Sequence, residues 1–101
     1  MQLIAKKSKK LAFLQLSGCI NAVDDSSIIY IARLTNLTFL DISYCNRLTD
    51  NQASVFRETL PLDSLVMNGL GGVSSVFVTA ILKSCAKTLL EFEGSNNDHL
   101  D

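Results

Sequence analysis

A nine-residue pattern recurs four times along the chain, with a leucine at its first position and large apolar residues at most of its fourth and sixth positions. The copies occupy residues 11–19, 37–45, 62–70 and 89–97, at intervals of 26, 25 and 27 residues. The ninth position is Cys in the first two copies, Leu in the third and Asn97 in the fourth. Self-similarity at a fixed period predicts stacked structural units instead of one irregular core.

A second shared pattern lies between the copies. The segments 23–25, 48–50 and 73–75 each combine an apolar residue with Asp, Thr or Ser, and each runs into apolar residues at helical spacing. Thr49 followed by Gln52 fits a capping box, in which each side chain bonds a free backbone N–H. Each unit is therefore predicted to be a strand, a turn and a helix, and the fold class to be α/β, with a parallel sheet on one side and helices on the other.

These patterns divide the chain into units. The predicted units are 11–36, 37–61 and 62–88, followed by a partial unit and tail at 89–101. Residues 3–11 align without a gap on residues 81–89, so residues 1–10 are predicted to be the end of a preceding helix or a degenerate cap. The alignment favours a piece of a longer repeat array, because nothing in the sequence is a dedicated polar cap.

The motifs LxxLxLSGC and LxxLDISYCNRLTD resemble the cysteine-containing subtype of leucine-rich repeat, best known from F-box proteins. The resemblance is strong over 11–60, weaker over 61–94 and absent over 95–101. It implies a horseshoe-shaped solenoid with a concave sheet and a convex helical side. It also implies substrate or partner recognition, as in F-box-type ubiquitin ligase receptors. The alternative is a structural subunit or scaffold within a larger stable assembly.

Side chains alternate along a strand, so the residues between the core leucines are predicted to point outward. The candidate protein-binding residues on this concave face are Phe13, Gln15, Phe39, Asp41, Ser64, Val66, Glu91 and Glu93. Phe13 and Phe39 should stand side by side, either as an anchor for a partner or simply packed against each other. The acidic residues among the eight suggest a partner with a polar or basic surface.

The positions of the three cysteines favour a structural role over a catalytic or metal-binding role. The only histidine, His99, lies in the tail, far in sequence from Cys19 and Cys45, and the three cysteines lack the close paired spacing of a zinc site. The ninth-position side chain is predicted to bond backbone in the neighbouring coil, and Cys85 to fill core on a helix. We therefore expect no enzyme activity, no metal and no cofactor. Unpaired cysteines also suggest an intracellular protein, cytoplasmic or nuclear.

Net charge and hydropathy limit the classes of partner that the chain is expected to bind. Nine Lys and Arg against ten Asp and Glu leave a formal net charge of −1, which does not favour a nucleic-acid partner. The one basic cluster, at residues 6–10, is interpreted as a solvated helix end. No apolar run approaches the length of a membrane span. A protein partner is the remaining expectation.

Overall fold

The computed structural model describes residues 12–19, 21, 23–56 and 59–95. The predictions for residues 1–10 and for the tail beyond residue 95 lie outside this part of the chain. In chain order the described elements are β1 (Phe13–Gln15), α2 (Asp25–Ile31), β2 (Phe39–Asp41), the 3-10 helix η1 (Asp50–Val55), β3 (Ser64–Val66), α3 (Ser75–Cys85) and β4 (Glu91–Glu93). The alternation of strand and helix that the repeat predicts is therefore present.

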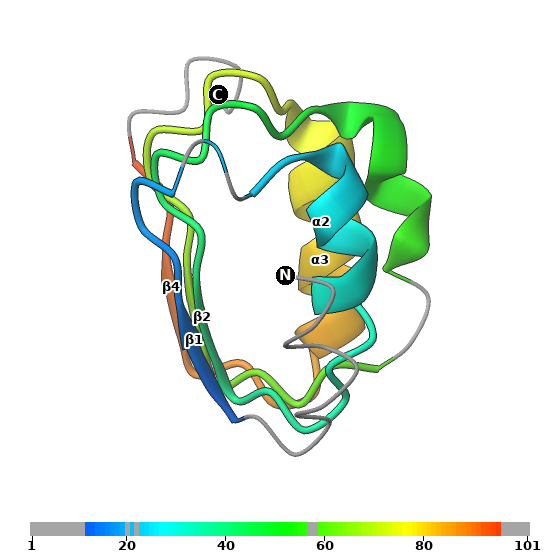
Figure 1. The fold of residues 1–101 in the computed structure, drawn as a ribbon. Coiled ribbons are helices and arrows are strands. Elements are labelled where there is room, and N and C mark those ends of the chain that lie inside the picture. Colours follow the sequence, from blue (N-terminus) through cyan, green and yellow to red (C-terminus); the bar gives the residue numbers. More distant parts are fainter. Residues whose placement is uncertain (1–11, 20, 22, 57–58, 96–101) are drawn as a thin grey trace.

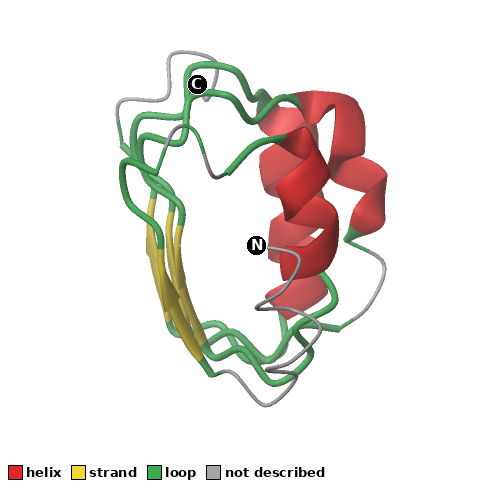
Figure 2. Ribbon diagram, in the orientation of Figure 1, coloured by secondary structure: helices red, strands yellow, loops and turns green. Residues whose placement is uncertain are grey.

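The four strands form one parallel sheet in the order β1-β2-β3-β4, which is also their order in the chain. Their middle residues, Leu14, Leu40, Leu65 and Phe92, stand in register. The helices lie on one side of this sheet, and the chain passes from sheet to helix and back in each unit (Figure 1; Figure 2 shows the two layers by colour). The predicted α/β class with a parallel sheet is confirmed.

The core lies between the sheet and the helices. Leu40 and Leu65 from the sheet meet Ile28 from α2 and Phe77 from α3, and all four side chains are fully buried. In the second and third repeats the first, fourth and sixth positions thus supply one wall of the core, and the helix-spaced apolar residues supply the other. Burying a side chain of this size stabilises the fold by roughly 1.5–3 kcal/mol.

The helices begin where the sequence predicts. Asp24, Thr49 and Ser74 are the N-cap residues of α2, η1 and α3, and each side chain accepts a hydrogen bond from a backbone N–H of the first turn. These oxygens satisfy donors that have no partner within the helix. A reciprocal capping box forms at Asp24 and Ser27, whereas Thr49 accepts from the amide of Asn51.

The second predicted helix has a different form. Residues Asp50–Val55 make a 3-10 helix, and Gln52 has a non-helical backbone with φ −111° and ψ 20°. Asp, Asn, Ser and Val are all weaker helix formers than Ala or Leu, and they make up most of this segment. Low helix propensity therefore accompanies the kink at Gln52, and η1 also packs against both α2 and α3.

Each unit is also tied to the next at the helix starts. The Asp25 carboxylate accepts from the amide and hydroxyl of Thr49, and the Asp50 carboxylate accepts from the amide and hydroxyl of Ser74. We call these two sets of bonds the cap pairs. Serine replaces aspartate at the third equivalent position, Ser75. The cap pairs fix the spacing of α2, η1 and α3.

None of the helices that the structure describes has the length and apolarity that crossing a bilayer would require.

Candidate protein-binding face

The candidate site is the face of the sheet that points away from the helices. We call it the outer sheet face and define it by its eight residues: Phe13, Gln15, Phe39, Asp41, Ser64, Val66, Glu91 and Glu93. Strand register arranges them in two rows across the sheet. The structure therefore brings all eight predicted residues onto one face, although their exposure differs.

Two phenylalanines dominate one end of this face. The rings of Phe13 and Phe39 stack with centroids 4.2 Å apart and planes 6° from parallel. Their backbones are neighbours in register, and the amides of Thr38 and Phe39 both donate to the carbonyl of Ala12. Phe13 remains 56% exposed despite the stack. The predicted side-by-side placement is confirmed, and a large apolar surface remains open to solvent.

Asp41 differs from the prediction. It was expected as an exposed acidic contact, but it is only 8% exposed, and its carboxylate accepts from the amide of Ser43 at 3.0 Å. Ser43 is buried too, and its hydroxyl accepts from the amide of Asn68. The strand ends at Asp41, so this carboxylate bonds a backbone N–H of the following turn. Asp41 is therefore a structural residue of the face.

The opposite end of the face carries exposed carboxylates. Glu91 and Glu93 are both exposed on β4. The side-chain amide of Asn68 donates to Glu93 at 2.6 Å, and the carbonyl oxygen of that amide accepts from both the backbone N–H and the hydroxyl of Ser95. Asn68 is not one of the eight residues predicted from the sequence. The structure shows that it positions Glu93.

Tyr44 borders the face, although it is not one of the eight predicted residues. It follows β2 with a left-handed backbone, φ 61°, and its side chain is 46% exposed. Its ring lies against Gly69, where an added Cβ would come within 2.4 Å of two ring carbons. Gly18, Tyr44 and Gly69 occupy the eighth position of successive repeats and all have positive φ. That alignment was the signal that could have located Tyr44.

The cysteines lie behind the face. The Cys45 thiol donates to the carbonyl of Leu16 at 3.2 Å, which confirms the predicted bond from a ninth-position side chain to neighbouring backbone. Cys85 is buried in α3, as expected, and its thiol donates to the carbonyl of Ile81. Burial raises the pKa of both thiols, which disfavours the thiolate form. Cys19 is half-buried, and all three cysteines are free.

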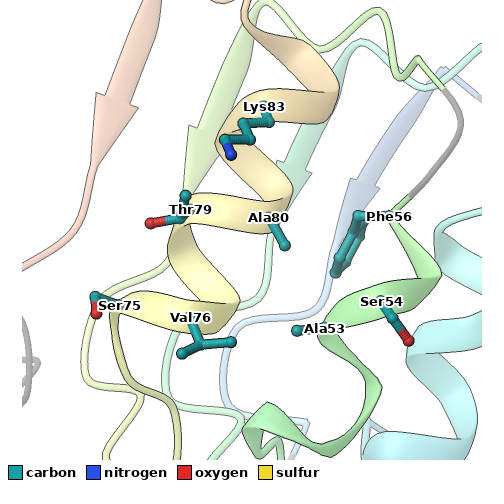
Figure 3. Close-up of a pocket in the computed structure, with 8 residues that line it drawn as sticks. All are labelled: Ala53, Ser54, Phe56, Ser75, Val76, Thr79, Ala80 and Lys83. Carbon is teal, nitrogen blue, oxygen red and sulfur yellow. The ribbon is translucent and has the colours of Figure 1, made fainter.

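A metal site and a pocket are two other kinds of site that the described residues could form. No group of three or more His, Cys, Asp or Glu side chains there could hold a metal ion. An open groove of about 520 Å³ lies between η1 and α3, on the helical side. Figure 3 shows Ala53, Phe56, Val76 and Ala80 lining it, with Lys83 at one end. Sequence reasoning did not find this groove, which opens beside the kinked η1.

The chain matches no protein-family model, no curated protein and no solved structure.

Proposed function

We propose that the chain is a segment of a leucine-rich-repeat solenoid whose concave surface is the outer sheet face. Three observations support this proposal. The repeat interval of 25 to 27 residues fits the family range, the strands follow one another in chain order, and the bond from Cys45 to Leu16 links neighbouring coils at the expected position. The helices would then form the convex side.

The function we propose is protein–protein recognition through this face, in the manner of F-box-type substrate receptors. The observation that carries it is the exposed Phe13–Phe39 stack. The Phe13 side chain points away from the core, so it does not help to bury the core residues. More than half of the surface of Phe13 is exposed to solvent. Exposed aromatic side chains of this kind are enriched among residues that dominate binding energy. A partner that covers the ring pair would remove this apolar area from water.

The proposal extends to the cellular compartment of the chain and to the larger polypeptide or assembly in which it works. Cys45 and Cys85 are free and buried, which fits a reducing, intracellular compartment, cytoplasmic or nuclear. We also propose that the chain works within a longer polypeptide or a larger assembly, because repeat units bury their faces against neighbouring units. No catalytic role is proposed, because burial raises the pKa of Cys45 and Cys85 and so disfavours their thiolate forms.

Affinity capture from a native lysate tests this function. The wild-type chain is compared with Phe13→Ser/Phe39→Ser, and Val76→Ser is the matched control, because Val76 is equally exposed but lies on α3. Circular dichroism verifies that each variant remains folded. We expect partners to be retained by wild type and Val76→Ser and lost by the double variant. Equal capture by all three proteins would refute recognition through the outer sheet face.

A second candidate, a structural role in a stable assembly, is favoured by a different observation. Leu90 is 84% exposed and Phe92 is 43% exposed, both at the β4 side of the sheet. Within the described residues β4 pairs with β3 alone, and apolar exposure at such an edge favours association with another chain. Under this alternative, Leu90→Ser/Phe92→Ser should reduce self-association in sedimentation velocity, whereas Phe13→Ser/Phe39→Ser should leave it unchanged.

A further inference from the structure

We propose that the outer sheet face binds an extended protein segment that crosses the strands, with an apolar side chain on the Phe13–Phe39 stack and a Lys or Arg beside Glu91 and Glu93. This inference rests on the proposed function and specifies the chemistry of its partner. It follows from the order of side chains across the sheet. That order places aromatic rings at one end and carboxylates at the other.

The exposed negative charge of the outer sheet face lies at one end of it. Asp41, Glu91 and Glu93 are its only acidic residues, and none of the eight is basic. Asp41 is buried, and its carboxylate is occupied by the amide of Ser43. The exposed negative charge is thereby confined to β4. The face is polarised along the direction that crosses the strands.

The spacing and the hydrogen bonds of Glu91 and Glu93 suit them to bind a cation. They are two residues apart on one strand and point to the same side, so their α-carbons are about 7 Å apart. Asn68 holds Glu93 at 2.6 Å and is itself held by Ser95. Among the described residues, neither glutamate has an ion-pair partner. One cation placed between them can therefore interact with both carboxylates.

The distance from β4 to the phenylalanine strands matches the length of a few residues of an extended segment. Neighbouring strands lie about 4.8 Å apart, so the phenylalanine strands β1 and β2 stand about 14 and 10 Å from β4. An extended segment advances about 3.3 Å per residue. Residues four positions apart point to the same side of an extended segment and lie about 13 Å apart, so an apolar residue and a basic residue at this separation would reach the stack and the carboxylates together. Ser64 and Val66 between them present a small, mostly uncharged surface over which the segment passes.

Short synthetic peptides provide the test. The peptides are dye-labelled and consist mainly of Gly and Ser. Each carries one Trp and one pair of Lys residues, in either order. The separation between the Trp and the Lys pair is varied one residue at a time. A matched set carries Glu in place of Lys. Binding to the full chain is followed by fluorescence anisotropy at low and high ionic strength. We expect the Lys peptides with a four-residue separation to bind most tightly, because their Trp and Lys side chains point to the same side. They should exceed their Glu counterparts by about three- to tenfold at low salt and by less at high salt.

Variants identify the groups involved. Glu91→Gln should weaken the best Lys peptide by about two- to fivefold, whereas Asp63→Asn should have no effect. Asp63 is the matched control, because it is an exposed carboxylate in the turn before β3, outside the two rows. Phe13→Ser/Phe39→Ser should weaken both the Lys and the Glu peptides.

Three results would overturn the inference. They are no peptide binding up to millimolar concentration, equal binding of Lys and Glu peptides, and equal effects of Glu91→Gln and Asp63→Asn. None of them decides the proposed function, which depends on whether lysate partners are lost with the phenylalanines. Capture that requires Phe13 and Phe39 but is insensitive to Glu91→Gln would leave the function standing and refute only the basic partner.

Discussion

Asp24 shows how one carboxylate at a helix start makes stability depend on pH. Hydrogen bonds from the Ser26 hydroxyl and from the amide and hydroxyl of Ser27 lower the pKa of Asp24 from 3.8 to about 2. A carboxyl group whose pKa is depressed in the folded state contributes stability above its unfolded pKa. That stability is lost as pH falls from 3.8 through about 2. The charge of Asp24 therefore stabilises the fold at neutral pH.

Asp24→Asn tests this dependence, because Asn keeps a capping oxygen and removes the charge. The free energy of unfolding, measured by urea titration between about pH 5 and pH 2, should fall less steeply for the variant than for wild type. The difference between the two curves isolates Asp24 from the other carboxylates. Parallel curves would show that the hydrogen bonds do not favour the ionised form.

Gly69 and Gly18 share a left-handed backbone but have different surroundings. An alanine Cβ at Gly69 would come within 2.4 Å of the Tyr44 ring, whereas at Gly18 it meets no described atom within 4 Å. Gly18→Ala should therefore cost only the backbone term, about 1–2 kcal/mol, and Gly69→Ala clearly more. Urea denaturation of the two variants measures the difference. Adding Tyr44→Gly to Gly69→Ala should restore most of the excess loss, and equal losses at the two glycines would contradict the contact.

Among the elements, the cap pairs hold neighbouring helices together. Asp50→Ala removes the acceptor for both the amide and the hydroxyl of Ser74, which are partly buried. Leaving such donors without a partner costs about 1–3 kcal/mol. Asp50→Asn, which retains one acceptor oxygen, should lose less. Asp63→Ala provides the surface control and should change the free energy of unfolding by at most about 0.5 kcal/mol. If Asp50→Ala matches that control, the cap pairs do not stabilise the stack.

The elements also show where sequence reasoning succeeds and where it stops. Strand positions, register and helix starts could be predicted, because they depend on periodic apolar residues and on single capping side chains such as Asp24 and Ser74. The form of η1 could not, since it depends on a kink at Gln52 and on packing against α2 and α3. The role of Asp41 was missed for a similar reason: the turn after β2 brings the Ser43 amide to its carboxylate.

Across the whole molecule, the environment of the central strand residue changes from β2 to β4. Leu40 and Leu65 are fully buried, whereas Phe92, at the equivalent position of β4, is 43% exposed. In a stack where each unit contacts only its neighbours, stability is approximately a sum of unit and interface contributions. Among the described strands β4 has one neighbour and a partly exposed central residue, so it should open more often than the strands inside the sheet.

Three equivalent amides make this expectation measurable. The amides of Phe39, Ser64 and Glu91 open β2, β3 and β4, and each donates to a carbonyl of the preceding unit. Because their local hydrogen bonding is the same, differences in hydrogen exchange report their place in the stack. Glu91 should exchange fastest and Ser64 slowest, by about tenfold or more, under native conditions. Equal rates at all three amides would instead mean that the described units open together as a single cooperative body.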